Sequence, residues 1–133
     1  MWIGSIGAEH VADLPISVLE TRSFSVDAKR LMTEEELAEL TMYVATNPRE
    51  GEIIPRTRGV RKLRWPLLRK GKRAGARVIY FHHNRSMPIF LLAIYSKNQK
   101  IDLSETEKRQ VKNLVTELVT EYRKVNSEWR MIS

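Results

Sequence analysis

The chain contains no cysteine and no long run of apolar residues. Without thiols it can form neither disulfides nor thiolate metal sites, which is compatible with a reducing cytoplasm. A membrane-spanning helix needs roughly 20 consecutive apolar residues. The first fifteen residues also lack the basic start and continuous apolar stretch of a secretory signal. We therefore expect a cytoplasmic protein with no membrane segment.

Acidic residues are absent from the span 53–101. This span holds 13 of the 23 Lys and Arg residues and none of the 16 Asp and Glu residues, so its net charge is +13. The rest of the chain has a net charge of −6. Such asymmetry indicates a polyanionic partner, a nucleic acid first and an acidic protein second. The alternative is a merely solvated basic surface, which usually leaves some acids interspersed.

The same absence limits the possible chemistry. A magnesium-dependent nuclease needs clustered carboxylates, and only Asp102 stands at the edge of the basic span. His82 and His83 would point to opposite sides of a strand, so they cannot chelate one metal ion. The glycines at 71 and 75 lack the Gly-Lys-Ser/Thr ending and the following helix of a phosphate-binding loop. We therefore expect neither a metal ion nor a cofactor.

The length of 133 residues and the hydrophobic fraction of 42% favour one compact domain with a single core. We expect an N-terminal extension of uncertain order at residues 1–15, the domain at 16–125 and a C-terminal tail at 126–133. The chain is expected to fray after Arg123.

Local patterns predict two long helices that both begin with a capping box. Thr33 and Glu36 form the first box, and the helix ends at Asn47-Pro48 because the residue before a proline disfavours the helical region. Ser104 and Glu107 form the second box. The other expected elements are strands at 16–24, 53–54, 60–65, 77–83 and 89–95, a helical turn at 25–31, a basic loop at 66–75, a hairpin turn at 83–86, and an apolar helical stripe of Val111, Leu114, Val115, Leu118 and Tyr122.

This order predicts an α+β fold, an antiparallel β-sheet with helices packed on one face. The opposite face would then be free for the basic residues. Tyr80 and Phe81 straddle one strand, so one should be buried and the other exposed. Trp65 either caps the sheet edge or stacks a nucleobase.

Metal-free cleavage of RNA is one reaction that a cationic site supports. The 2′-hydroxyl attacks the adjacent phosphate, helped by a base, by cations that stabilise the developing charge and by an acid. Arginine suits the second task, and lysine or tyrosine can transfer protons. Alternation places Lys62 and Arg64 on the same face of their strand, and Tyr95 and Lys97 on the same face of theirs, while Arg77 opens the strand between them. These side chains could converge on the uncovered face of the sheet. Alternatively, Arg77 and Lys97 only solubilise strand ends.

Three stretches, in this order, resemble the HigB branch of the RelE/ParE toxin superfamily. They are 59–64 (GVRKLR), 71–81 (GKRAGARVIYF) and 91–98 (LLAIYSKN), with Asp102-Leu103 following. The resemblance covers roughly residues 24 to 122. It implies a microbial-ribonuclease-like α+β fold and a type II toxin that cleaves mRNA in the ribosomal A site and inhibits translation. It also implies neutralisation by a helix-turn-helix antitoxin of the HigA kind.

By position, the resemblance implies a catalytic set within the basic span. Arg64 and Arg77 would stabilise the phosphate, Lys62 is the candidate base, Lys97 a second phosphate contact or acid, and Tyr95 a further candidate. Contacts with RNA or the ribosome are expected from Arg56, Arg58, Arg61, Arg69, Lys70, Lys72, Arg73 and Lys100.

Two other functions stay open. A ParE-like protein would share the fold but inhibit DNA gyrase without cleaving anything, and it would need no cationic active site. A DNA-binding autorepressor would need a recognition helix with basic and polar residues, whereas both long helices here are acidic or mixed. The charge pattern favours RNA and the ribosome.

Overall fold

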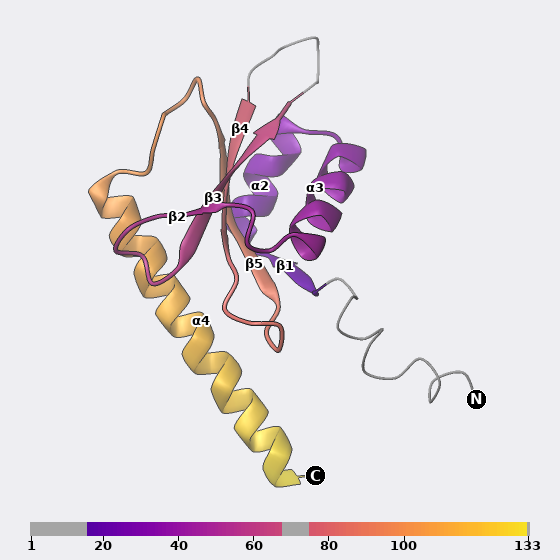
Figure 1. Ribbon diagram of the computed structural model, residues 1–133, viewed down its shortest axis with the longest axis vertical. Coiled ribbons are helices and arrows are strands. Elements are labelled where there is room, and N and C mark those ends of the chain that lie inside the picture. Colours follow the sequence, from indigo (N-terminus) through magenta and orange to yellow (C-terminus); the bar gives the residue numbers. More distant parts are fainter. Residues whose placement is uncertain (1–15, 68–74, 133) are drawn as a thin grey trace, which may run out of the picture.

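The structure is a computed structural model that describes residues 16–67 and 75–132, with side chains up to residue 125. Figure 1 shows a central sheet with helices packed against it. The elements follow the order β1 (Val18–Glu20), α2 (Arg22–Leu31), α3 (Glu34–Thr46), β2 (Glu52–Ile53), β3 (Val60–Pro66), β4 (Gly75–Phe81), β5 (Ile89–Ser96) and α4 (Glu105–Ile132). The predicted α+β class is confirmed.

The sheet has five strands in the order β1-β5-β4-β3-β2. Strands β2 to β5 pair antiparallel, as the short loops between them predict. Strand β1 instead pairs parallel with β5, with Leu19 opposite Phe90, so the sheet is mixed. The central strand β4 is buried from Val78 to Phe81, because it has a neighbouring strand on each side and helices on both faces.

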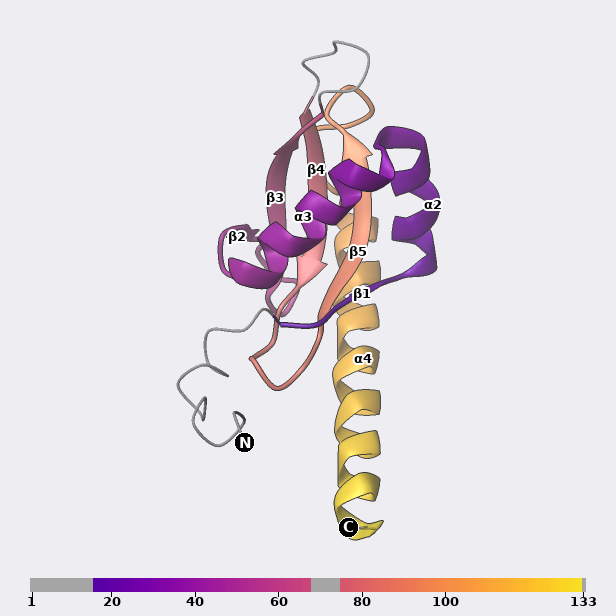
Figure 2. The ribbon, with the colours of Figure 1, turned by 90° about the vertical axis from the view of Figure 1, so that its right-hand side faces the viewer.

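Helices α2 and α3 cover one face of the sheet (Figure 2). Phe24 of α2 and Leu40 of α3 are fully buried, and they belong to one core cluster with Leu63, Val78 and Leu91 of the strands. The first capping box is confirmed, since the Thr33 hydroxyl accepts from the Glu36 N–H while the Glu36 carboxylate accepts from the Thr33 N–H. Burial of these apolar side chains is the main force that holds the two helices on the sheet.

Helix α4 lies against the other face, so that face is not wholly free (Figures 1 and 2). The residues of its expected stripe, Val111 to Tyr122, pack in a second core cluster with Ile79, Phe81 and Leu92. This explains why both Tyr80 and Phe81 are buried, at 0% and 2% exposure, where the sequence predicted one exposed aromatic. An amphipathic helix must bury its apolar stripe, and the apolar residues on the second side of β4 and β5 supply the surface.

Several boundaries differ from those expected, and the ends of β1 and α4 differ most. Strand β1 ends at Glu20 because Thr21 caps α2, its hydroxyl accepting from the Phe24 N–H at 3.2 Å. Helix α4 continues to Ile132 instead of fraying after Arg123, and no glycine or proline interrupts it. Within the described residues no helix combines the length and the apolarity that crossing a membrane requires.

Candidate functional site

Three of the candidate residues form one row across the sheet. Arg64 of β3 lies directly opposite Arg77 of β4, and Arg77 lies directly opposite Tyr95 of β5. Directly opposed residues of antiparallel strands point to the same face, with Cβ atoms about 4.5–5.5 Å apart. We call Arg64, Arg77 and Tyr95 the basic row. It lies on the face against which α4 packs, since Tyr95 belongs to the same cluster as the α4 side chains.

The two arginines of the basic row are like charges in register, an arrangement that destabilises a sheet unless an anion lies between them. Arg64 is exposed and Arg77 half-buried. Neither forms an ion pair with a carboxylate in the part of the chain that the structure describes. The only hydrogen bond found for either guanidinium, among described residues, is from Arg77 Nη1 to the Ala76 carbonyl at 3.4 Å. Two guanidinium groups without a carboxylate partner can both turn toward one phosphate.

The other two catalytic candidates lie at the same end of this face. Lys62 is two residues before Arg64 on β3, so its side chain shares the Arg64 face. Lys97 follows the last residue of β5, and its exposed side chain starts from a backbone whose N–H donates to Gly75 at the start of β4. The structure therefore places Lys62 and the three residues of the basic row on one face, with the backbone of Lys97 beside the start of β4.

Tyr95 is only 4% exposed. Burial raises the pKa of its phenol, Asp102 raises it further, and Arg77 opposes both. Its hydroxyl donates to the Ile101 carbonyl at 3.5 Å, and the Lys100 ammonium lies 4.9 Å from the ring centroid. At neutral pH the phenol keeps its proton, so it can donate a hydrogen bond or a proton but does not act as a base.

The fold also adds two carboxylates, to which sequence reasoning assigned no role in the site. Asp102, in the loop between β5 and α4, forms an ion pair with Lys62. Glu107, in the first turn of α4, forms one with Lys100. The hydrogen bond from Lys62 lowers the pKa of Asp102, and the hydrogen bond from Lys100 lowers that of Glu107. Both acids are therefore ionised at neutral pH.

The sequence singled out both acids but did not indicate their lysine partners. Glu107 belongs to the second capping box, which is confirmed, since its backbone N–H donates to the Ser104 hydroxyl and its carboxylate accepts from the Ser104 N–H. Asp102 simply borders the acid-free span, and nothing in its spacing indicates Lys62, which is 40 residues away.

Lys62 lines two clefts, one at the open edge of β3 and one beside the loop before α4. One cleft of about 440 Å³ is lined by Tyr43, Glu50, Glu52, Lys62, Leu63, Arg64, Trp65 and Pro66. The other, of about 250 Å³, is lined by Glu52, Ile53, Ile54, Pro55, Lys62, Asp102, Leu103 and Lys108. The larger cleft exists because β2 pairs only with residues 61 and 62, which leaves the rest of the β3 edge open. Trp65 packs there against Tyr43, with ring centroids 5.4 Å apart, and is half-buried.

The remaining predicted RNA contacts are dispersed. Arg56 and Arg58 are exposed, and Arg56 pairs with Glu105 at 3.1 Å. Arg61 does not join the basic row, because alternation turns it to the α3 side, where its Nη1 donates to the Arg49 carbonyl at 3.1 Å and the Gly51 carbonyl at 2.7 Å. Lys100 lies beside Tyr95. Arg69, Lys70, Lys72 and Arg73 lie outside the described residues.

No model of a known protein family matches the chain. Among the side chains that the structure describes, residues 16–67 and 75–125, no three His, Asp or Glu are grouped as metal ligands would be. The function must therefore be argued from the basic row and its neighbours.

Proposed function

We infer that this protein is an endoribonuclease that cleaves mRNA in the ribosomal A site without a metal ion. It would act in the cytoplasm as the toxin of a toxin–antitoxin pair. The observation that carries the proposal is the basic row, in which Arg64 and Arg77 oppose each other on neighbouring strands and form no ion pair among the described residues. A phosphate that becomes more negative during cleavage is the group that such a pair stabilises best.

The neighbours of the basic row supply groups for the proton transfers. The 2′-hydroxyl attacks the adjacent phosphorus, its proton goes to a base, and the leaving 5′-oxygen takes a proton from an acid. This forms a 2′,3′-cyclic phosphate on one fragment and a 5′-hydroxyl on the other. We assign the first transfer to Lys62, which takes the 2′-hydroxyl proton as it passes one of its own protons to the paired Asp102 carboxylate. Lys97 is the candidate acid or a further phosphate contact, and Tyr95 keeps its proton and can donate to a phosphate oxygen.

The ribosome and the antitoxin come from the resemblance of residues 59–64, 71–81 and 91–98 to HigB-type toxins. Under this proposal the rRNA and mRNA are the polyanionic partners that the charge of the span 53–101 indicates. A helix-turn-helix antitoxin of the HigA kind would neutralise the activity by binding the toxin.

The decisive experiment is a reconstituted translation reaction with and without ribosomes, in which primer extension maps the new 5′ ends of the mRNA. We expect ribosome-dependent cuts with the wild-type chain. Arg64→Ala and Arg77→Ala should each lower the cleavage rate by about 10²–10³-fold, the usual loss when one donor to a developing anion is removed. Arg22→Ala, which removes the same charge from the first residue of α2, is the matched control and should cleave at the wild-type rate.

The chemistry of the new ends tests the metal-free mechanism. A 5′-hydroxyl, which a polynucleotide kinase can label without prior phosphatase treatment, is the expected product. A 5′-phosphate would contradict attack by the 2′-hydroxyl. Intact mRNA together with blocked translation, or with inhibited gyrase, would move the function to the class of non-catalytic inhibitors.

A further inference from the structure

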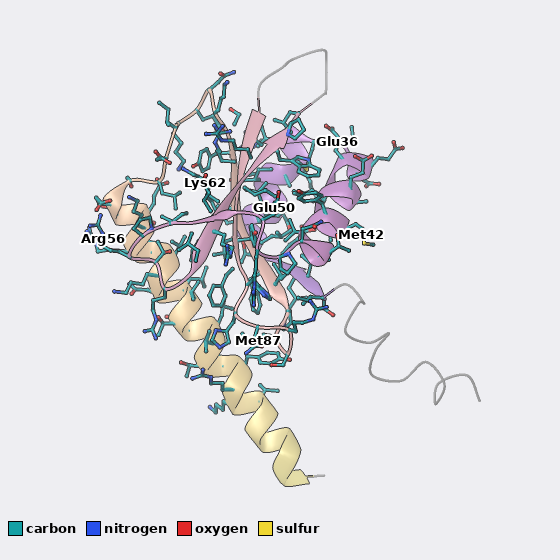
Figure 3. The ribbon with its side chains drawn as sticks, viewed as in Figure 1. Glu36, Met42, Glu50, Arg56, Lys62 and Met87 are labelled. Carbon is teal, nitrogen blue, oxygen red and sulfur yellow. The ribbon has the colours of Figure 1, made fainter. Side chains whose placement is uncertain are left out.

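A third cleft lies on the side of the sheet that α3 covers. It has a volume of about 420 Å³ and is lined by Asn47, Pro48, Arg49, Glu50, His82 and Arg85. We call it the α3 cleft. It is formed where the chain leaves α3 and where β4 ends, so it involves none of the residues of the basic row. Figure 3 shows Glu50, one of its residues, on the α3 side of the sheet.

The loop beneath the α3 cleft is held by side chains from the sheet. The Tyr80 hydroxyl donates to the Pro48 carbonyl at 2.8 Å and accepts from the Gly51 N–H at 2.9 Å. Arg61 donates to the carbonyls of Arg49 and Gly51. A Cβ at Gly51 would lie 2.9 Å from the Tyr80 ring, so only glycine fits this close approach. These bonds engage carbonyls of the loop, which would otherwise repel an anion.

The charge around the α3 cleft is mostly positive. Arg49, Arg61 and Arg85 all act on His82, and together with burial, which contributes most, they lower the pKa of its imidazole. Glu50 is the one carboxylate among the lining residues. Within the described residues neither Arg49 nor Arg61 forms an ion pair. The cleft therefore has guanidinium charge that the fold leaves uncompensated.

Two buried nitrogen atoms strengthen this point. Arg61 Nε and His82 Nδ1 are buried and have no hydrogen-bond partner among the described residues. A buried donor without an acceptor costs about 1–3 kcal/mol, and more when the group is charged. A ligand that accepts hydrogen bonds would offset this cost, and the positive charge around the cleft favours an anion.

We propose that the α3 cleft binds one phosphate group of a structured RNA, as an anchoring contact separate from the basic row. Arginine recognises phosphate through two parallel hydrogen bonds, and Arg49 and Arg85 both line the cleft. Arg61, His82 and Arg85 also belong to the acid-free span, whose charge indicates a nucleic acid. The proposal does not require that the basic row cleaves RNA.

The position of the cleft favours folded RNA over a single extended strand. His82 comes directly after β4, five residues beyond Arg77, which corresponds to about 17 Å of extended chain, and it lines the α3 cleft. A strand bound flat on the basic row cannot also enter the α3 cleft. A folded RNA that contacts the protein on two sides can reach both.

The test uses the full chain and two probes, inorganic phosphate and an RNA stem-loop that contains no cleavage site. Proton–nitrogen NMR spectra follow the His82 ring and the Arg49 side chain during phosphate titration, and fluorescence anisotropy measures stem-loop binding over a range of salt concentrations. The variants are Arg49→Gln, Arg85→Gln and His82→Gln, with Arg22→Gln as the control. Arg77→Gln separates the phosphate response of the α3 cleft from that of the basic row.

We expect phosphate to shift the His82 and Arg49 signals in the wild type and in Arg77→Gln. Arg49→Gln and Arg85→Gln should weaken stem-loop binding about five- to tenfold and reduce the salt slope by about one each, as the loss of one phosphate contact does. Wild-type affinity and salt slope in both variants would overturn the proposal. So would a phosphate response at His82 that disappears in Arg77→Gln, or an acidic peptide that saturates the cleft while RNA does not. Loss of cleavage activity alone would concern the basic row and leave this result unchanged.

Discussion

The two faces of the sheet differ in charge and exposure even between residues that are neighbours in the sequence. Arg64, Arg77 and Tyr95 form the row on the α4 side, whereas the neighbouring register row of Trp65, Ala76 and Ser96 belongs to the α3 side. Ala76 is fully buried and Trp65 packs on Tyr43 of α3, while Arg64 is exposed. Helices α2 and α3 cover their face, whereas the stripe of α4 packs around Phe81 and Leu92 and leaves the charged end exposed. Successive residues of one strand point to opposite faces, so the same strands contribute to both the core and the candidate site.

The largest effect should come from the covered face. Phe24→Ala removes a fully buried ring from the cluster that joins α2 to the sheet, and it should lower the free energy of unfolding by about 3–5 kcal/mol. Urea denaturation followed by circular dichroism measures it. Val26→Ala, two residues along the same helix at a side chain that is 55% exposed, is the control and should change stability by less than about 0.5 kcal/mol. Equal losses in both variants would contradict the assignment of the core.

A smaller loss should follow from Tyr80→Phe. The phenol joins two backbone groups of the 48–51 loop, and its removal leaves the Gly51 N–H and the Pro48 carbonyl without that partner. We expect a loss of about 1–3 kcal/mol, because a buried unsatisfied polar group costs that much. The matched control is Tyr122→Phe, whose hydroxyl makes an exposed bond to the Ser86 carbonyl and should contribute less. Hydrogen exchange of the Gly51 amide should rise in Tyr80→Phe and stay constant in the control.

Much of this architecture could be predicted because it depends on local rules. Both capping boxes, the end of α3 before Pro48 and the stripe from Val111 to Tyr122 are confirmed. Each involves residues close together in the sequence. The parallel pairing of β1 with β5 could not be predicted in this way, since it joins Leu19 to Phe90.

In the candidate site, too, local patterns predicted some features, whereas others depend on contacts between distant residues. Alternation and strand order brought Lys62, Arg64, Arg77 and Tyr95 to one face. The Lys62–Asp102 pair was missed because it depends on where the loop before α4 folds back, which no local pattern encodes. The placement of Arg61 on the other face follows from alternation, so its predicted contact with RNA would come from the α3 side.

Removing one of the two opposed arginines should stabilise the fold, in contrast to the two substitutions above. Arg64→Ala removes one of two like charges that face each other across β3 and β4, and it should raise the free energy of unfolding by about 0.2–1 kcal/mol. Trp65→Ala, the next residue on the covered face, should lower it instead, because it removes the ring that packs on Tyr43. Urea denaturation at low salt measures both. In 0.5 M salt the gain in Arg64→Ala should shrink, because screening weakens the repulsion, whereas the loss in Trp65→Ala should remain.

The smallest effect concerns the ion pair beside the basic row. Lys62 lowers the pKa of Asp102 below its usual value of 3.8, so the folded state binds this proton less readily than the unfolded chain. The stabilisation is therefore complete above 3.8 and declines as the pH falls through the lowered pKa. Because the Asp102 side chain is 60% exposed, solvent screening limits the contribution to about 0.5 kcal/mol.

Asp102→Asn should accordingly be slightly less stable than the wild type at pH 7 and equally stable once the pH is well below 3.8. Urea denaturation at pH 7, 5, 4 and 3 measures this difference. Glu121→Gln is the control, since Glu121 is an exposed carboxylate that forms no ion pair among the described residues. A difference that persists at the lowest pH would mean that Asp102 stabilises the loop by another route. A difference that vanishes on acidification would mean that the Asp102 carboxylate stabilises the fold through its ion pair with Lys62, the contact that the proposed proton transfer needs.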